Sequence, residues 1–597
     1  IYQATAQEPL GVVRRRHIAT RARTVTSVED ELLDVDQAQH QGLTLQGEGA
    51  LMSALSSARS GRMGDIVATI QGEQDRVIRA SDRGILVVQG GPGTGKTAVA
   101  LHRAAYLLYT QRERLERSGV LIIGPSRTFL RYIEQVLPSL GESGVVQMTI
   151  GDIVPGLSAQ DDDPVDIAAI KGRAAFSRIL REAVRLIPRL PDRDQVLQVW
   201  NRRVTLRIKD VQEALSRARR SGRPHNVARE SFAMGLMELL AGRLIVEAGD
   251  ASSTADIDPD DLRTWMSEIR DSVDARRAIN LAWMPTQAPA FLRKLWSRPD
   301  LLAQANRKAG TPLSVEDLSL LYRAQDEPLT ISDIPLIDEL EELLGTLDLA
   351  SAQKRRAEEQ REKEERERAN EALKATGLGG GIVTADMLMR QTQEAPSLRP
   401  LAERARADRS WTYGHIVIDE AQDLSPMAWR CLLRRCPSRS MTVVGDLDQK
   451  RGHRRPNSWK QALGPAARAF NEEFVLSISY RTPRALTRIA QAVMAQHGTP
   501  VLYPMEAVRD VPDCYQVSHT HKDTLKECVS QVVSTMEERL DREEGEGKGR
   551  ICVIVPDAQA QLWHADESGA SALDQRVSYL TAAGSKGLEF DSVVVVE

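Results

Sequence analysis

Eight residues at positions 90–97, GGPGTGKT, place glycines, a lysine and a threonine at the spacing of a phosphate-binding loop. They follow the apolar run Ile85–Val88 and precede AVALHRAAYLL, which has a helical pattern. Glycines let backbone N–H groups wrap phosphate oxygens, and the following helix directs its positive dipole end at the same phosphates. Lys96 would reach the β- and γ-phosphates, and the Thr97 hydroxyl would bind Mg²⁺. The pattern predicts an ATP site.

Two carboxylates, Asp419 and Glu420, follow the apolar segment HIVI at 415–418. A buried strand that ends in such a pair is a Walker B arrangement, in which Asp419 would hold Mg²⁺ and Glu420 would polarise an attacking water. Water as the acceptor indicates hydrolysis of ATP. A solvated acidic turn after a core strand would give the same residues, but it accounts less well for a chain that also has a phosphate-binding loop.

Further residues could contact the nucleotide. The amide of Gln74 can read adenine with one donor and one acceptor. Gln449 follows the strand-like MTVVG and would sit near the γ-phosphate. Tyr480 offers an aromatic face for adenine, and Arg481 offers a guanidinium for phosphate. Each of these alone is explained as well by a surface or core position, and only their joint order along the chain favours a site.

The elements that must position these residues alternate between two patterns. Residues 64–156 and those from about 410 onward alternate apolar strands with helices, whereas long amphipathic helical patterns fill 157–405. We therefore expect an α/β nucleotide-binding core with a large, mostly helical insertion, followed by a second α/β domain. Six strands are predicted: Ile85–Val88, Val120–Ile123, Ile416–Ile418, Met441–Val444, Ile551–Val555 and Ser592–Val596.

The domain limits follow from these changes of pattern. At 597 residues the chain is too long for one core. The predicted segments are an N-terminal piece packing on the first domain (1–60), the first domain in two parts (61–156 and 406–464), the insertion (157–405) and the last domain (465–597). Within these segments we expect an acidic helix to begin at SVEDELLD and a solvated helix to cover Lys354–Arg368.

Composition narrows the class of protein. The net charge of −4 is unusual for a protein that lives by gripping nucleic acid, although local patches matter more than the sum. The five cysteines include no CxxC pair, which is typical of reduced thiols in the cytosol. No apolar run of membrane-spanning length and no signal peptide occur, so a cytoplasmic protein is expected. A start at Ile1 and an end after Val593–Val596 suggest that both ends are cut.

The order of the motifs LHRAAYLL, VIDEAQD, VVGDLDQ, SYRT and GSKGLEF resembles the UvrD/Rep-like branch of superfamily 1 helicases, over 85–156 and 410–597. The resemblance implies two RecA-like P-loop domains with ATP between them. It also implies adenine stacking on Tyr480, an arginine finger at Arg481, help from Arg103 on the first domain, and contact of Glu589 with the ribose or the metal-bound water. Lys586 stands three residues before Glu589, where both would face the cleft.

The complete candidate site has three overlapping sets of residues. The catalytic residues are Lys96, Asp419, Glu420, Gln449 and Arg481. The residues that bind the cofactor ATP are Gln74, Gly91, Gly93, Thr94, Gly95, Lys96, Thr97, Ala98, Arg103, Tyr480 and Glu589. The Mg²⁺ ligands are Thr97 and Asp419.

The chain departs from the helicase pattern where helicases hold single strands. Aromatic residues that stack on bases are the usual way to grip and step along a strand. Here the corresponding segments are GPSRTFLRYI and KRGHRRPNSWK, which leave Trp459 as the candidate platform. The motif VI segment is absent, and the helical insertion takes the place of the usual DNA-binding subdomain.

A closer likeness covers these departures. The segments EPLGVVRRRHI, SVEDELLD, IDEAQDLSPMAWR and INLAWMPTQAPAFLRKLW resemble the actinobacterial HelD family. This likeness implies a superfamily 1 ATPase that binds core RNA polymerase, opens its clamp and releases nucleic acid. The polymerase partner depends on the resemblance alone. The alternatives are a 3′-to-5′ DNA helicase acting in repair, with DNA as the ligand, and a nucleotide-gated binding module.

Two acidic loops in the insertion, Asp161–Asp163 and Asp256–Asp261, carry clustered negative charge. A partner that grips phosphate has a basic channel, which such loops could occupy or border. Ordinary solvated loops explain the same charges equally well.

Overall fold

The computed structural model describes residues 11–21, 24–32, 72–136, 144–249, 257–345, 401–450, 452, 455–512, 514–543, 545–566, 575–582, 584–586, 588 and 590–597. The chain forms two compact units. Unit 1 contains residues 1–172 and 401–597, and unit 2 contains residues 173–400. The sequence had suggested limits of 157 and 405 for the inserted segment. Residues 157–172, with helix α7 (Val165–Lys171), belong to unit 1 instead.

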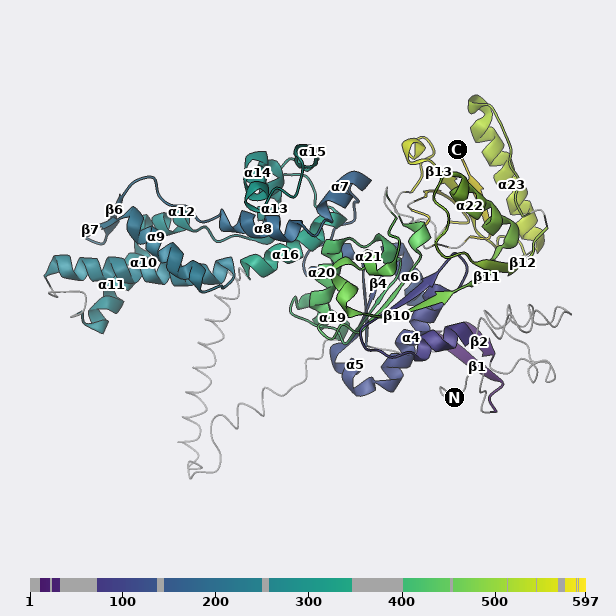
Figure 1. Cartoon of the computed structure of the whole chain (residues 1–597), viewed down its shortest axis with the longest axis horizontal. Coiled ribbons are helices and arrows are strands. Elements are labelled where there is room, and N and C mark those ends of the chain that lie inside the picture. Colours follow the sequence, from purple (N-terminus) through teal and green to yellow (C-terminus); the bar gives the residue numbers. More distant parts are fainter. Residues whose placement is uncertain are drawn as a thin grey trace, which may run out of the picture. The chain divides into compact units, whose positions relative to one another are not determined.

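The centre of unit 1 is a six-stranded sheet in the order β10-β3-β9-β8-β4-β5, and every neighbouring pair is parallel (Figure 1). The strands are β3 (Ile85–Gly90), β4 (Val120–Ile123), β5 (Val145–Met148), β8 (His415–Ile418), β9 (Met441–Gly445) and β10 (Phe470–Leu476). Four of them are buried along their whole length, as expected of a parallel sheet covered on both faces: β3, β4, β8 and β9. The predicted α/β class is therefore confirmed, and its central sheet is parallel.

Helices connect the parallel strands. They are α4 (Lys96–Thr110), α5 (Arg112–Ser118), α6 (Arg127–Val136), α19 (Leu401–Ala407), α20 (Pro426–Arg435) and α21 (Trp459–Ala462). Helix α4 buries Val99, Leu107 and Leu108 in one apolar cluster with Val88 of β3 and Ile122 of β4. Parallel strands present their carboxyl ends at one edge, where open α/β sheets bind ligands.

The last part of unit 1 differs from its predicted boundary. Residues from 465 were assigned to the second α/β domain, but β10 pairs parallel with β3 at the edge of the first sheet. Asn471, Glu472 and Glu473 make β10 a half-exposed edge strand, so it has no apolar run to mark it in the sequence. Two smaller parallel sheets follow, of β11 (Ile478–Pro483) with β12 (Glu506–Arg509), and of β14-β13-β15. The remaining elements are α22 (Arg484–Gln496), α23 (Leu525–Glu543), β13 (Ile551–Val555), β14 (Val577–Thr581) and β15 (Ser592–Val595).

The expected N-terminal helix at SVEDELLD is wrong. Residues 27–32 of this segment lie in β2 (Thr24–Leu32), which pairs antiparallel with β1 (Arg14–Arg21). The register sets the basic run of β1 opposite the acidic run of β2, with Arg15 facing Glu31 and Arg16 facing Asp30. Opposite charges in cross-strand positions favour such a pairing, and a sequence window confined to the acidic run cannot show it.

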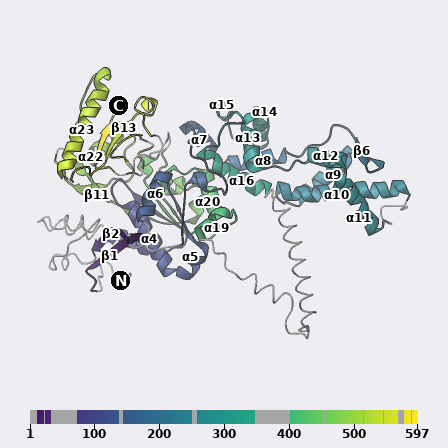
Figure 2. The same ribbon diagram turned by 180° about the vertical axis from the view of Figure 1, so that it is seen from behind.

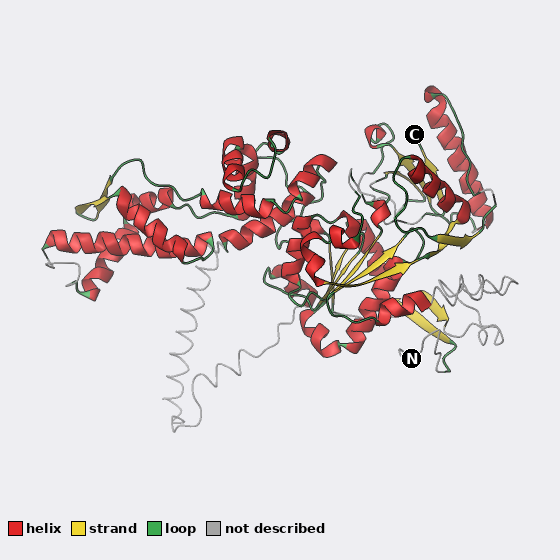
Figure 3. Cartoon of the chain, viewed as in Figure 1, coloured by secondary structure: helices red, strands yellow, loops and turns green. Residues whose placement is uncertain are grey.

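Unit 2 is mainly helical in its described part, with one hairpin of β6 (Gln195–Val199) and β7 (Arg202–Leu206) (Figure 3). Its longest helix, α10 (His225–Ala248), buries Phe232, Leu236, Leu240 and Leu244 at helical spacing and ends at Gly249, whose φ is +81°. The other helices are α8 (Phe176–Arg185), α9 (Ile208–Arg220), α11 (Pro259–Asp271), α12 (Val273–Ala282), α13 (Ala288–Ser297), α14 (Pro299–Lys308), α15 (Val315–Leu320) and α16 (Ile334–Leu344).

The acidic loops have local structural roles. Asp163 is paired with the fully buried Lys171 at 2.7 Å, and only 4% of the Asp163 side chain is exposed. Asp258 caps α11 by accepting a hydrogen bond from the Asp260 amide. Asp256 and the predicted helix at Lys354–Arg368 lie outside the described residues. No helix among the described residues has the length and apolar character needed to cross a bilayer.

Candidate active site

The glycine loop links β3 to α4 and takes the shape that a phosphate needs. Gly93 and Gly95 have φ values of +72° and +79°, which other residues rarely adopt. The Thr94 hydroxyl donates to the Gly91 carbonyl at 2.9 Å and closes the turn. Lys96 begins α4, so Thr97 and Ala98 lie in the first turn, where the free backbone N–H groups of the helix point at the loop.

The Walker B carboxylates lie beside the end of this loop. The Thr97 hydroxyl donates to Asp419 Oδ2 at 2.6 Å, and Lys96 Nζ is 3.8 Å from Glu420 Oε1. These contacts join residues more than three hundred positions apart. They exist because β8, which carries the carboxylates, is separated from β3 only by β9 in the sheet.

The donor set fits a hard divalent cation. Asp419 and the Thr97 hydroxyl supply oxygen ligands, which Mg²⁺ prefers. Burial, with repulsion from Glu420, raises the pKa of Asp419 to about 6 despite the nearby Lys96 ammonium. Burial makes the negative charge of Asp419 costly, and a divalent cation bound to its carboxylate would compensate that charge. Thr97 and Asp419 would hold Mg²⁺, which would neutralise phosphate charge.

Glu420 has a strained backbone and is held from several sides. Its φ of +51° lies in the left-handed region, which is rare for a residue with a side chain and concentrates at functional sites. Its Oε2 accepts a hydrogen bond from Gln422 Nε2 at 2.6 Å and lies 3.5 Å from Lys586 Nζ. Lys586 also pairs with Asp423. The carboxylate is thus fixed in position at the edge where the phosphates would lie.

A buried polar network connects Glu420 to Gln449. Gln422 Oε1 accepts from the Asp446 amide at 3.1 Å, and Asp446 Oδ2 accepts from Gln449 Nε2 at 2.8 Å. Gln89, the last side chain before the glycine loop, donates to Asp446 Oδ1 at 2.8 Å. The network therefore touches the glycine loop, the Walker B segment and the turn that follows β9.

The proposed base-stacking role of Trp459 is wrong. Its side chain is fully buried, and its indole N–H donates to Gln89 Oε1 at 2.9 Å. A large apolar side chain with a satisfied N–H is a core residue, and no face is left for a base. Sequence alone could not separate this position from an exposed platform, because the flanking KRGHRRPNSWK is polar.

The segment Ser479–Thr482 packs directly on the glycine loop. The amide of Tyr480 donates to the Gly93 carbonyl at 3.1 Å, and the Ser479 hydroxyl donates to the Pro92 carbonyl at 2.8 Å. The Arg481 guanidinium lies 5.6 Å from the centre of the Tyr480 ring. The Arg481 amide also contacts the Gly93 carbonyl, at 3.4 Å, so this residue lies beside the phosphate-binding loop, and its role as an arginine finger stays a prediction.

Tyr480 and Gln74 converge at Gly95. A Cβ added to Gly95 would contact the Tyr480 hydroxyl and would lie 3.1 Å from Gln74 Nε2. A side chain at this position would therefore displace the Tyr480 hydroxyl, in addition to the strain of the positive φ. The Tyr480 ring is fully buried, so its stacking on adenine stays a prediction that requires the ring to become exposed.

Arg103 occupies a different place from the expected one. It is fully buried, and its nitrogens donate to the Thr442 hydroxyl and to the carbonyls of Val77, Ile78, Ala80 and Ser81. Burial lowers its pKa to about 10. The guanidinium ties the end of the helix at 72–79 to the sheet, so a direct role in nucleotide binding is not supported. Glu589 lies outside the described residues.

Sequence reasoning missed three members of the polar network: Gln89, Gln422 and Asp446. Gln89 had a usable signal, because it is a polar residue at the end of an otherwise apolar strand that enters the glycine loop. Gln422 stands two residues after Glu420, at the spacing that lets its amide turn back to the carboxylate. Asp446 had no signal, because its partners come from three separate segments.

Two family models match the chain. The model of the AAA domain matches residues 73–452, which is more than half of the chain and includes both the glycine loop and the Walker B segment. The model of the N-terminal domain of DNA helicase IV HelD matches residues 1–42. No curated protein matches the sequence. Both matches agree with the resemblance read from the motifs.

Proposed function

The chain belongs to the HelD family of superfamily 1 helicase-type proteins, and we propose that it is an ATP-driven motor that binds RNA polymerase and remodels it. In this proposal the motor opens the polymerase clamp and releases nucleic acid, so that the enzyme can be used again. The α/β unit supplies two RecA-like domains with ATP and Mg²⁺ between them. The helical segment of unit 2 is an insertion in the first domain that contacts the partner.

The observation that carries the ATPase part is the junction of the glycine loop with the Walker B carboxylates. Thr97 and Asp419 are in contact at 2.6 Å, and Lys96 lies 3.8 Å from Glu420. The loop and Lys96 would bind the phosphates, and Glu420 would accept the proton of the attacking water. The fixed position of Glu420 favours water as the acceptor.

The contacts of the later segments support opening and closing around the nucleotide. The backbone amide of Arg481 contacts the Gly93 carbonyl at 3.4 Å, which holds this residue beside the glycine loop, and the Lys586 ammonium lies 3.5 Å from Glu420. The side chains of both would turn to phosphate when ATP binds. A nucleotide can shift a conformational equilibrium only through contacts that differ between the two states, and these two cations supply them.

Two observations support polymerase remodelling over strand separation. The candidate platform for bases, Trp459, is buried and hydrogen-bonded within the core. The N-terminal match is to the HelD model. The resemblance of this chain to the HelD family implies RNA polymerase as the partner. That same model is described as part of a DNA helicase, so a 3′-to-5′ DNA helicase acting in repair is the second candidate.

One paired experiment separates the candidates. Purified chain is mixed with immobilised core RNA polymerase, and in parallel with a duplex that carries a 3′ single-stranded tail, each with and without ATP. The proposal predicts polymerase binding with ATP-dependent release, and no strand separation. Strand separation without polymerase binding would establish the helicase. Polymerase binding that ATP does not affect, with no hydrolysis, would indicate a nucleotide-gated binding module.

A further inference from the structure

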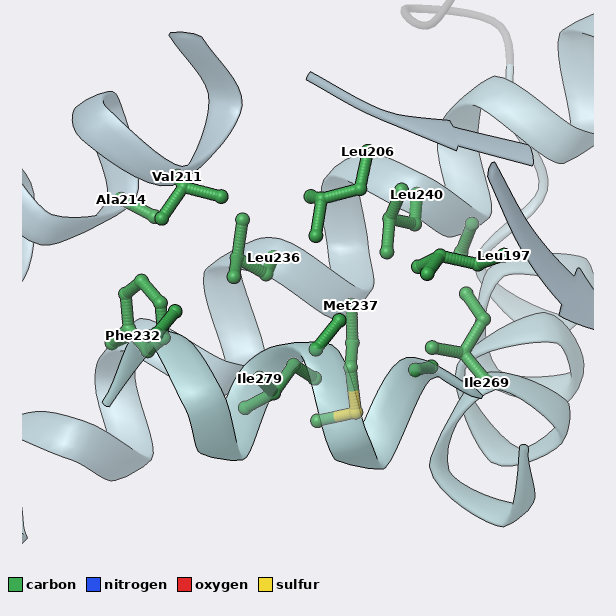
Figure 4. Close-up of a cluster of buried hydrophobic side chains, with 14 of the residues drawn as sticks. Leu197, Leu206, Val211, Ala214, Phe232, Leu236, Met237, Leu240, Ile269 and Ile279 are labelled. Atoms are coloured by element: carbon green, nitrogen blue, oxygen red, sulfur yellow. The ribbon is translucent and has the colours of Figure 1, made fainter. Parts of the chain in front are cut away.

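The hairpin β6–β7 of unit 2 has a buried inner face and an open outer face. Leu197, Val199, Val204 and Leu206 point inward and join α10 in one apolar cluster; Figure 4 labels Leu197 and Leu206 beside Leu236 and Leu240. The alternating residues Val196, Gln198 and Arg203 face outward and are exposed. Figures 1 and 2 show the hairpin beside α12.

Trp200 stands at the tip of this hairpin and is 71% exposed. It forms a two-residue turn with Asn201 between the paired Val199 and Arg202. Its φ of +49° is in a region that glycine and asparagine favour and tryptophan does not. Trp200 thus keeps a large aromatic ring exposed to water on a strained backbone. Backbone strain of this kind concentrates at functional and ligand-binding sites.

The tip is attached firmly to the helices below it. The Gln198 amide donates to Asp274 Oδ2 at 3.1 Å, and the Ser272 hydroxyl donates to the Gln198 carbonyl at 2.7 Å. Both partners belong to the junction of α11 and α12. The outer face is therefore a preformed surface, and binding to it would need little ordering.

The segment 185–223 around the hairpin is strongly basic, with eleven Lys or Arg and four Asp or Glu in a chain whose net charge is −4. Three of the four acids have internal partners. Asp194 accepts from the Ile208 amide, Asp210 pairs with Arg243, and Glu213 pairs with Arg217. Asp210 is thus neutralised from outside the segment, and Glu213 by one of the segment's own arginines.

Several cations of this segment have no such partner. Among the residues that the structure describes, no carboxylate oxygen lies within 4.0 Å of Arg193, Arg203, Lys209, Arg220 or Arg223, and all five are exposed. Arg203 pairs in register with Gln198, two residues before Trp200. Of the five, Arg203 lies on the hairpin itself, on the same outward face as Gln198, whereas Arg220 and Arg223 lie at the other end of α9. Arg203 and the exposed ring of Trp200 thus share the hairpin.

We propose that this face of the β6–β7 hairpin binds single-stranded nucleic acid, with one unpaired base stacked on Trp200 and a backbone phosphate held by Arg203. Stacking on an aromatic side chain requires a base that is free of its partner strand, and the exposed Arg203 guanidinium can pair with a phosphate. The site lies in unit 2 and does not depend on the proposed action on polymerase.

The test measures the binding of fluorescently labelled oligothymidylate to the full chain by anisotropy, without nucleotide. Trp200→Ala is expected to weaken binding about tenfold or more, because one base loses its stacking partner. Trp200→Phe should keep most of the affinity. Tyr322→Ala, which removes a ring of unit 2 that is 59% exposed, is the matched control and should change nothing.

A second variant tests the phosphate contact. Arg203→Gln should reduce the slope of log affinity against log salt by about 0.7, as expected for one lost contact to a single strand. Equal affinity of wild type, Trp200→Ala and Arg203→Gln would overturn the proposal. So would a Trp200→Ala variant that binds oligothymidylate normally and loses binding to core RNA polymerase, because the face would then belong to a protein partner. Circular dichroism of each variant checks that unit 2 is folded.

Discussion

At the scale of single residues, Glu420 combines a left-handed backbone, a hydrogen bond from Gln422 and a nearby Lys96. Glu420→Gln keeps the shape of the side chain and removes the base. We expect ATP to bind normally and the rate of hydrolysis to fall about a hundredfold or more. Nucleotide affinity and steady-state phosphate release measure the two effects separately.

The matched control for this variant is Glu113→Gln, which makes the same chemical change on the exposed side of α5. It should hydrolyse ATP at the wild-type rate. If Glu420→Gln also kept near-normal turnover, Glu420 would have no role as the base, and the strained backbone would need another explanation.

Arg103 gives the second prediction at this scale. Its guanidinium holds four carbonyls at the end of the 72–79 helix, so Arg103→Ala leaves several buried acceptors without a donor. Each unsatisfied group costs about 1–3 kcal/mol. The thermal midpoint of unfolding should fall sharply. A normal thermal midpoint together with a raised KM for ATP would instead show that Arg103 acts in nucleotide binding.

Prediction from sequence was strongest where one short segment carries the chemistry. Lys96, Thr97 and Asp419 were placed by spacing and by the apolar runs before them, and the structure brings these residues together. The burial of Arg103 and Trp459 could not be predicted. Each is surrounded by segments far away in the chain, and a polar or mixed neighbourhood in sequence says nothing about those distant partners.

At the scale of elements, His225 at the start of α10 couples the core of unit 2 to pH. Burial lowers its pKa to about 4, although a hydrogen bond to the Met284 carbonyl acts in the opposite direction. The Trp283 indole N–H also donates to this ring, which only a neutral imidazole can accept. The unfolded chain would take up a proton near pH 6.5.

The sign of the effect follows from the lowered pKa. Between pH 6.5 and 4 the unfolded state binds more protons than the folded state, so stability is lost as the pH falls through this window. The loss approaches about 3 kcal/mol at its lower end. His225→Gln should be less stable than wild type at pH 7.5 and should lose less on acidification. Thermal unfolding of both proteins at the two ends of the window checks this, and parallel pH profiles would contradict it.

Elements with internal periodicity were predicted well, and those defined by pairing were not. The strand Val120–Ile123 and the strand Ile551–Val555 appear with the predicted limits. The pairing of β1 with β2 and the joining of β10 to β3 depend on a partner strand elsewhere in the chain. A single sequence window contains no information about that partner, which explains both differences.

At the scale of the whole molecule, the proposed motor works only if ATP changes the contacts that the later segments of unit 1 make with the glycine loop and the Walker B carboxylate. Arg481 and Lys586 come from residues beyond the six-stranded sheet and yet touch the glycine loop and the Walker B carboxylate. Loss of an arginine finger costs about a thousandfold or more in hydrolysis. Arg481→Ala should therefore bind the partner normally and fail to respond to ATP. Arg488→Ala, on the exposed side of α22, is its control.

The most direct measurement of the central claim is ATP-stimulated dissociation of the chain from immobilised core RNA polymerase, compared between wild type and Arg481→Ala. The account predicts that both proteins bind, that ATP releases the wild type and the Arg488→Ala control, and that Arg481→Ala stays bound. Failure of the wild type to bind the polymerase, or release of Arg481→Ala at the wild-type dependence on ATP, would contradict it.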